Sequence, residues 1–130
     1  MLNIIISVKP KYAAEILSGR KKYEYRKFVF KKAVNKIYVY ASSPQKKFIG
    51  YFFYDGFIRG TPEYIWKHTG ADAGIGESEF FNYYKNTKDA FALIINRFYP
   101  FAVFMNPSVV SEKFCAPQSY MYFEGDIEGE

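Results

Sequence analysis

The sequence has few of the side chains that most often bind metals or cross-link small domains. It contains one cysteine, Cys115, and one histidine, His68, in 130 residues. A single cysteine excludes an internal disulfide, and these two residues lack the paired spacing of a zinc site. The acidic residues also lack the spacing of a calcium-binding loop. We therefore expect no metal, no cofactor and no cysteine nucleophile.

Long apolar runs are missing as well. No stretch approaches the roughly 18 apolar residues that cross a bilayer, and no charged segment followed by an apolar one opens the chain. The sequence therefore predicts a cytoplasmic protein without a membrane segment.

What the chain does contain is aromatic and apolar. Hydrophobic residues make up 49% of it and aromatic residues 22%, with 14 Phe and 13 Tyr. Such a composition argues against disorder and favours strands over bundled helices. The length fits one domain. We predict a single domain over residues 1–123, followed by an acidic, flexible tail over residues 124–130 that is too polar to pack.

Positive charge is concentrated in the first third of the chain. Residues 1–47 hold 12 of the 18 Lys and Arg but only two acids, whereas the remainder holds 6 basic and 11 acidic residues. This asymmetry is what an anion-binding face would produce. A plain solvated surface is the alternative, because neighbours in sequence need not be neighbours in space.

Charge lies next to a tight helix end in residues 9–27. Pro10 suits the first position of a helix, and Gly19 suits the left-handed residue just past its end. The apolar residues between them recur at helical spacing, at Tyr12, Ala13, Ile16 and Leu17. The pattern predicts a helix over 10–18 and, where the period changes to two, a strand over 21–30.

The rest of the chain is predicted to form strands with one helical insertion. Glycines at bend points within the strands, such as Gly50 and Gly56, allow the strands to curve and so favour a barrel over a flat sheet. We predict an α+β fold on a partly open β-barrel of five to six mixed strands. Its elements are the short N-terminal helix, a two-helix insertion within about 62–86, and six strands. The strands are near residues 2–8, 21–30, 36–42, 48–58, 90–95 with an irregular continuation through 98–105, and 114–123.

Lys21, Glu24 and Arg26 are the strongest candidates for chemistry. Lysine and arginine bind phosphate as a point charge and as a fork, and a carboxylate between them can accept from a base amine and orient Arg26. Strand alternation places Lys22, Glu24 and Arg26 on one face and Lys21 on the other. The alternative is an ordinary solvent-facing row with a cross-strand ion pair, as most such rows are.

Four short motifs together resemble the ASCH family of PUA-like domains. They are Ser7-Val8-Lys9-Pro10, then Gly19-x-Lys21-x-x-Glu24-x-Arg26, then Tyr40-Ala41-Ser42-Ser43-Pro44, and finally Pro117-Gln118-Ser119-Tyr120. The resemblance covers about residues 2–122. It implies a small PUA-like β-barrel with a basic cleft that takes RNA or a nucleotide-like ligand.

The resemblance also adds residues to the predicted site. On composition alone they form an ordinary turn and an ordinary strand end, but their place in the family-like motifs implies that they line the cleft. Tyr120, with Tyr23 or Tyr25, is a candidate for base stacking. The ligand-binding set is then Lys9, Lys21, Glu24, Arg26, Ser42, Ser43, Gln118, Ser119 and Tyr120.

Three functions remain open at this point. The first is a binding module for RNA or a nucleotide-like ligand. The second, implied by a branch of the family, is an amidohydrolase acting on N4-acetylcytidine, with Lys21 and Glu24 as catalytic residues and Glu77 or Glu79 as a further acid. That branch has threonine where this chain has Glu24, and a carboxylate cannot donate to an oxyanion as a hydroxyl can. The third is a protein-interaction module. The sequence does not determine the oligomeric state.

Overall fold

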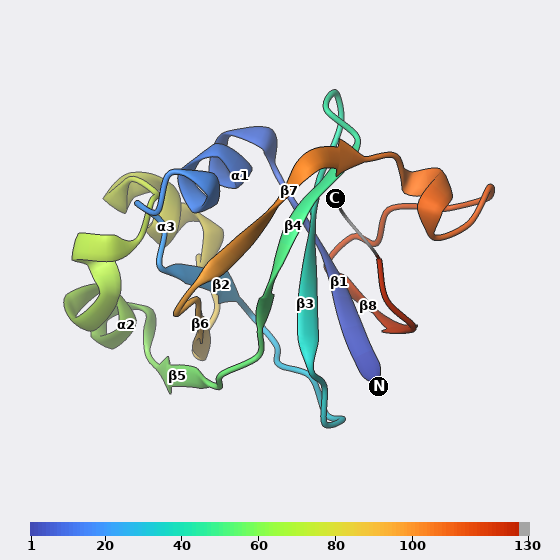
Figure 1. The fold of residues 1–130 in the computed structure, drawn as a ribbon. Helices are drawn as coiled ribbons and strands as arrows, with labels where there is room; N and C mark the ends of the chain where they lie inside the picture. Colours follow the sequence, from blue (N-terminus) through green and yellow to red (C-terminus); the bar gives the residue numbers. More distant parts are fainter. Residues whose placement is uncertain (128–130) are drawn as a thin grey trace.

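Two β-sheets form the frame of the molecule in the computed structural model, which describes residues 1–127 (Figure 1). The elements are, in chain order, β1 (Leu2–Val8), α1 (Pro10–Leu17), β2 (Tyr23–Arg26), β3 (Lys36–Ala41), β4 (Lys47–Phe53), β5 (Phe57–Gly60), α2 (Pro62–Thr69), η1 (Gly70–Asp72), α3 (Glu77–Tyr83), β6 (Ala90–Ile94), β7 (Phe98–Met105), η2 (Pro107–Val109) and β8 (Tyr120–Glu124).

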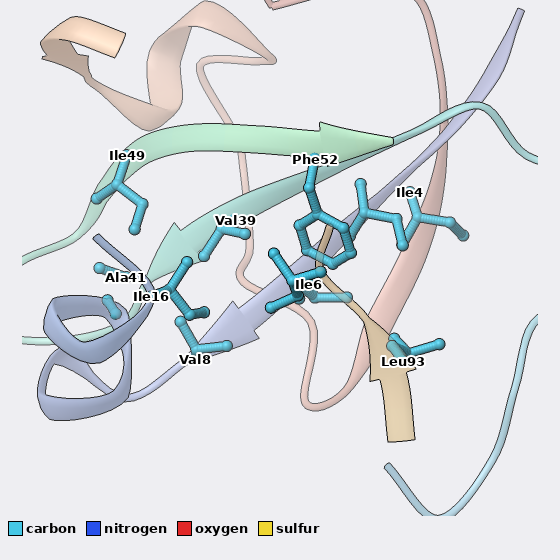
Figure 2. Packing of buried hydrophobic residues seen from close by; sticks show 12 residues of the cluster. Ile4, Ile6, Val8, Ile16, Val39, Ala41, Ile49, Phe52 and Leu93 are labelled. Carbon is cyan, nitrogen blue, oxygen red and sulfur yellow. The ribbon is translucent and has the colours of Figure 1, made fainter. Parts of the chain in front are cut away.

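The larger sheet has the order β7-β4-β3-β1-β8, with β1 and β3 parallel and the other neighbours antiparallel. Strand β1 is buried on both faces, which explains its nearly continuous apolar sequence. Ile4 and Ile6 pack with Ile16 of α1 in one core cluster (Figure 2), and Ile5 packs in another on the opposite face. Helix α1 therefore covers this sheet close to where β1 ends.

The smaller sheet, β2-β6-β5, is antiparallel throughout. Its apolar side packs against α2 and α3 through Tyr25, Ile65, Phe80 and Tyr84. Leu93 of β6 belongs instead to the core of the larger sheet. The two sheets thus share a core, and β2 lies between the larger sheet and the helical insertion.

The structure confirms the α+β class and the partly open β architecture. Eight strands are present among residues 1–127, more than the five or six predicted, because long aromatic stretches divide between the two sheets. The predicted strand 48–58 breaks at Asp55 and Gly56 into β4 and β5. Helix α1 ends one residue earlier than predicted, and the predicted strand 21–30 is reduced to β2.

The C-terminal segment differs from the expectation of an unpacked tail. Glu124 ends β8, and Ile127 is buried, with its N–H donating to the Tyr38 hydroxyl. The tail therefore packs at least to Ile127, because β8 pairs with β1 and carries it onto the sheet. Residues 128–130 of the predicted tail lie outside the described residues.

Neither a membrane span nor a metal-binding cluster is found within residues 1–127. No helix there is long and apolar enough to cross a bilayer. No three His, Cys, Asp or Glu side chains of these residues gather as metal ligands would.

Candidate functional site

A cleft of about 580 Å³ opens where the end of β1, the start of α1, strand β2, helix α3 and the segment before β8 meet. Its wall combines charged, hydroxyl and aromatic side chains. The lining residues are Ser7, Val8, Lys9, Tyr12, Lys21, Glu24, Tyr25, Arg26, Ser42, Ile75, Glu79, Asn82, Tyr83, Ala116, Pro117, Gln118 and Ser119.

The end of α1 determines where Lys21 lies. Gly19 adopts φ +81°, the left-handed conformation expected just past a helix end, and its N–H donates to Ile16 O at 3.1 Å. The chain then reverses, and the Lys21 N–H donates to Glu15 O at 3.0 Å. Pro10 and Gly19 thus define the two ends of α1, and the turn after Gly19 places Lys21 in the cleft directly before β2.

The segment between η1 and α3 closes over Lys21. Lys21 Nζ donates to Ala73 O at 2.9 Å, and the Lys22 N–H donates to Asp72 O at 2.9 Å. Gly74, with φ +61°, packs so closely that a Cβ there would lie 2.4 Å from Lys21 Cβ. A glycine is therefore required at this contact, and Lys21 is covered by backbone instead of water.

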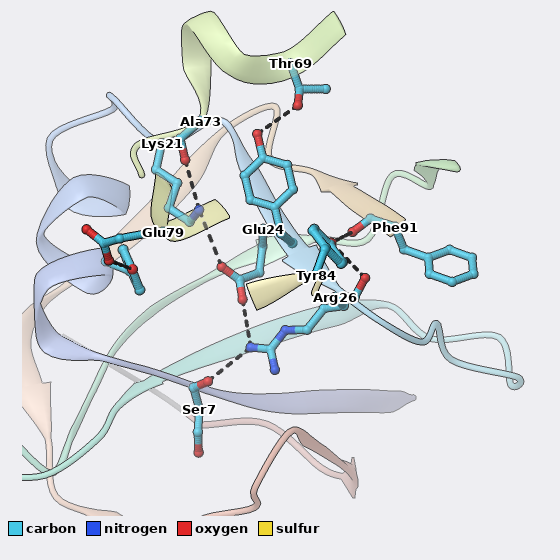
Figure 3. A network of polar contacts seen from close by, with 11 residues as sticks. Ser7, Lys21, Glu24, Arg26, Thr69, Ala73, Glu79, Tyr84 and Phe91 are labelled. Atoms are coloured by element: carbon cyan, nitrogen blue, oxygen red, sulfur yellow. Dashed lines mark hydrogen bonds and ion pairs between the residues drawn. The ribbon is translucent and has the colours of Figure 1, made fainter. Parts of the chain in front are cut away.

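Lys21, Glu24 and Arg26 form one row of charges inside the cleft (Figure 3). Lys21 Nζ lies 3.9 Å from Glu24 Oε1, and Arg26 Nη2 lies 2.8 Å from Glu24 Oε2. Their exposed fractions are only 3%, 6% and 8%. The alternative of a solvent-facing row is therefore wrong for these residues, whereas Lys22 is exposed.

The predicted alternation of faces is wrong for Lys21. Strand β2 begins at Tyr23, so Lys21 precedes the strand and is free of its two-residue period. Its side chain consequently turns toward Glu24 across an i, i+3 contact.

Arg26 is held by protein groups on almost every side. Its Nη1 donates to Ser119 O at 3.1 Å and Ser119 Oγ at 3.3 Å, and its Nη2 donates to Ser7 O at 3.0 Å and to Glu24. The Tyr84 hydroxyl donates to Arg26 O at 2.9 Å. The sequence suggests that the Arg26 guanidinium group binds a ligand phosphate. In the structure this group instead links β1, β2 and the residue before β8.

Burial controls the protonation of the cleft. Desolvation lowers the pKa of Lys21 below its usual range, with the neighbouring Glu24 carboxylate acting in the opposite direction. Burial raises the pKa of Tyr25 to about 12, so its hydroxyl stays protonated and hydrogen-bonds Thr69 Oγ1 at 2.8 Å. The pKa of Lys21 is therefore moved toward neutrality.

Most residues of the predicted site lie together. Lys9, Ser42, Gln118 and Ser119 line the cleft along with the charged row. Tyr120 is not among the lining residues; it packs against Phe30 with ring centroids 4.9 Å apart, because β8 turns that ring toward the core. Ser43 is also absent from the lining, being exposed in the turn after β3.

Sequence reasoning missed the aromatic and amide side chains from the two helices. Tyr12 of α1 and Tyr83 of α3 line the cleft, as do Ile75 and Asn82. Glu79, and not Glu77, is the acid of the insertion that reaches it. Tyr12 looks like part of an apolar helix stripe in the sequence, and only the position of α3 brings it to the site.

Comparison with known proteins finds one relative by sequence and several similar solved structures. No protein-family model matches the chain. A curated protein from Zymomonas mobilis, named ASCH domain-containing ribonuclease, is 29% identical over 97 residues, 74% of this chain and 66% of that protein. The chain thus matches about two thirds of that relative's length.

Solved structures agree over a longer stretch. The crystal structure of ASCH from Zymomonas mobilis matches with a TM-score of 0.85 and 26% identity, covering 94% of this chain and 87% of that one. A tyrosine-to-phenylalanine variant and a serine-to-alanine variant of that protein match with the same TM-score at 25% identity, covering 90% and 88% of their chains.

The sequence likeness and the fold likeness indicate the same family as the motifs of the sequence. The residues of the G-x-K-x-x-E-x-R motif are the ones that meet in the cleft, at Lys21, Glu24 and Arg26. In its motifs, its sequence and its fold, the chain therefore resembles the ASCH domain family.

Proposed function

We propose that the protein binds single-stranded RNA in this cleft and cleaves its phosphodiester backbone. The observation that carries the proposal is the desolvated Lys21, 3.9 Å from the Glu24 carboxylate on the wall of an open cleft. A charge whose pKa is shifted by desolvation and by a specific charge partner, and which lies in a cleft, marks a candidate functional site. The ribonuclease name of the relative from Zymomonas mobilis supports an RNA substrate.

A two-residue proton exchange fits this geometry. Glu24 Oε1, the oxygen not bound by Arg26, takes the proton of a ribose 2′-hydroxyl, whose oxygen then attacks the adjacent phosphorus. The new P–O2′ bond forms as the P–O5′ bond breaks, and the Lys21 ammonium gives a proton to the leaving O5′. The products are a 2′,3′-cyclic phosphate and a 5′-hydroxyl, and a proton passing from Glu24 to Lys21 restores both groups.

Arg26 and Ser119 act as positioning residues in this scheme. Because Arg26 holds Glu24 Oε2 and both serine-bearing strand ends, it fixes the carboxylate relative to the cleft wall. Lys9, which is exposed at the rim, remains available to a phosphate of the bound strand.

Cleavage explains the site better than passive binding does. Affinity for a polyanion comes from exposed cations, yet in this cleft two of the three cations are buried and paired with Glu24. A module that only bound RNA would have no need to desolvate Lys21.

The test is an RNA of mixed sequence compared with copies that carry a single 2′-deoxynucleotide. We expect cleavage of the all-ribose strand to give cyclic phosphate ends, and the deoxy substitution to block cleavage on the 3′ side of that nucleotide alone. Cleavage that continues at the deoxy position would contradict the proposed attack by the 2′-hydroxyl.

A second candidate function is amide hydrolysis of N4-acetylcytidine. It is favoured by Glu79, which reaches the cleft together with the retained Lys21. Against it stands Glu24 in place of the threonine of that branch. Release of acetate from N4-acetylcytidine that is lost in Lys21→Ala, without any RNA cleavage, would select this function over the first.

A further inference from the structure

A second hollow adjoins the cleft and has no role in the chemistry described above. It has a volume of about 500 Å³ and lies between α1, η1 and the start of α3. Tyr12, Ile75 and Glu79 line both hollows, so these three residues form a common wall. The two hollows are therefore neighbours on either side of this wall.

The common wall is tied together from both helices. Glu79 of α3 accepts from the Tyr12 hydroxyl and from Lys11 Nζ, the latter at 2.6 Å. These contacts hold the pKa of Glu79 below its usual range, chiefly through the Lys11 hydrogen bond. The wall is thus a carboxylate flanked by an aromatic ring and an ammonium group.

Lys21 lies next to this wall. Its Nζ is 5.5 Å from the centre of the Tyr12 ring and belongs to the lining of the cleft but not of the second hollow. A phosphodiester that reacts at Lys21 would therefore lie at the boundary between the hollows. Each of the two nucleosides that it joins then has a hollow on its own side.

The charges of the second hollow decide which part of a nucleotide it takes. Three carboxylates, on Glu15, Asp72 and Glu79, outnumber the two cations, Lys11 and Arg20. Arg20 Nε is also paired with Glu15 at 2.5 Å. This surplus of negative charge disfavours a phosphate inside the hollow, whereas carboxylates accept well from ribose hydroxyls and base amines. Tyr12 offers the ring face against which a base can stack.

We infer that the second hollow is a subsite for the neighbouring nucleoside of the RNA, with the shared phosphate at the Tyr12–Glu79 wall. This inference rests on the proposed function, and it specifies the ligand as at least a dinucleotide instead of a free nucleoside. Arg20, whose Nη groups have no partner among the described residues, is available at the rim for the next phosphate.

The test measures binding of strands that cannot be cleaved. Wild-type protein is titrated with a mononucleotide, a dinucleotide and a trinucleotide whose linkages follow 2′-deoxynucleotides, so affinity is read independently of turnover. We expect the dinucleotide to bind about tenfold tighter than the mononucleotide, which is the contribution of one stacked base.

A filling variant removes the subsite while leaving the cleft intact. Ala71 is exposed and lines only the second hollow, so Ala71→Trp can occupy it without disturbing the core. The gain from mononucleotide to dinucleotide should disappear in this variant. Ser78→Trp is the matched control, since Ser78 is exposed on α3 and lines neither hollow, and it should keep the gain.

Arg20→Ala provides a second variant in case the tryptophan impairs folding. It should lower the affinity of the trinucleotide severalfold and leave that of the mononucleotide unchanged. Lys22→Ala removes an exposed positive charge nearby, outside both hollows, and should change neither affinity.

The outcomes separate the inference from the proposed function. Equal affinities of wild type for the three ligands, no binding of any of them, or an undiminished gain in Ala71→Trp would each overturn the subsite, even if RNA is cleaved. A gain that Ala71→Trp abolishes would support the subsite even if the protein cleaves no RNA, and the proposed catalysis alone would then fail.

Discussion

The smaller sheet carries two ion pairs of similar length and very different surroundings. Arg59 of β5 contacts Asp89 at 3.2 Å with both side chains more than half exposed, while Arg26 of β2 contacts Glu24 at 2.8 Å with both nearly buried. Water screens the first pair, so it contributes little to stability. The second is desolvated, and its partners cannot be removed singly without leaving a buried charge. The two pairs should therefore differ sharply in what the loss of one partner costs.

Removing Arg26 should have the largest effect. Arg26→Ala leaves Glu24 buried without its ion-pair partner and removes the links to Ser7 and Ser119. We expect the free energy of unfolding, measured by urea denaturation, to fall by about 3–5 kcal/mol. A loss below about 1 kcal/mol would place this pair in the same class as Arg59–Asp89.

Removing the charge of Lys21 should act in the opposite direction. Lys21→Met keeps the volume and leaves Glu24 paired with Arg26, so the free energy of unfolding near neutral pH should rise by about 1–2 kcal/mol because no ammonium is desolvated. RNA cleavage should be lost at the same time. A stability loss of similar size would show that Lys21 serves the fold and not the site.

The pH dependence of that difference has a definite sign. Burial lowers the pKa of Lys21, so between the folded and unfolded pKa values the unfolded chain binds more protons. Wild type should therefore gain stability relative to Lys21→Met as the pH rises toward about 10.4, the usual lysine pKa. Urea denaturation of both proteins across this range measures the change, and a difference that widens with pH would contradict the desolvation of Lys21.

A smaller loss of stability is expected when the hydrogen bond to the backbone of Arg26 is removed. Tyr84→Phe removes the hydroxyl that donates to Arg26 O at 2.9 Å and leaves the ring against Phe80. The free energy of unfolding should fall by about 1 kcal/mol, the usual value of one buried hydrogen bond. An unchanged denaturation midpoint would indicate that this bond does not hold β2.

Breaking the exposed Arg59–Asp89 ion pair should have the smallest effect on stability. Arg59→Ala is expected to change the free energy of unfolding by less than about 0.5 kcal/mol and to leave RNA cleavage unaltered. A loss as large as that of Arg26→Ala would remove the contrast between the two ion pairs.

Local chemistry accounts for what the sequence could predict. Pro10 and Gly19 define both ends of α1 by backbone conformation alone, and the apolar run of β1 indicates a strand buried on both faces. The spacing of Lys21, Glu24 and Arg26 predicts three side chains that meet in the cleft, because the three are close in the chain. These signals depend on neighbours within a few residues.

The remaining features depend on contacts between distant segments. Nothing near Lys21 in the sequence indicates that residues 70–76 cover it, although that cover lowers its pKa. The rings of Tyr12 and Tyr120 exchange their expected roles for the same reason: α3 brings the first to the cleft, and pairing with β1 turns the second into the core. The sequence likewise does not show that the charged side chains of Lys21, Glu24 and Arg26 are buried.

Lys21 and Lys22 are adjacent in the chain, but the first is buried in the cleft and the second is exposed. Lys21→Ala, Lys22→Ala and wild type, purified side by side, are compared by the initial rate of cleavage of a fluorescent single-stranded RNA, so that a contaminating nuclease would raise all three rates alike. The buried Lys21 predicts a loss of at least about a hundredfold in Lys21→Ala, the scale of a removed general acid, and a wild-type rate in Lys22→Ala. Equal rates in the two variants would contradict the assignment of the chemistry to the buried row.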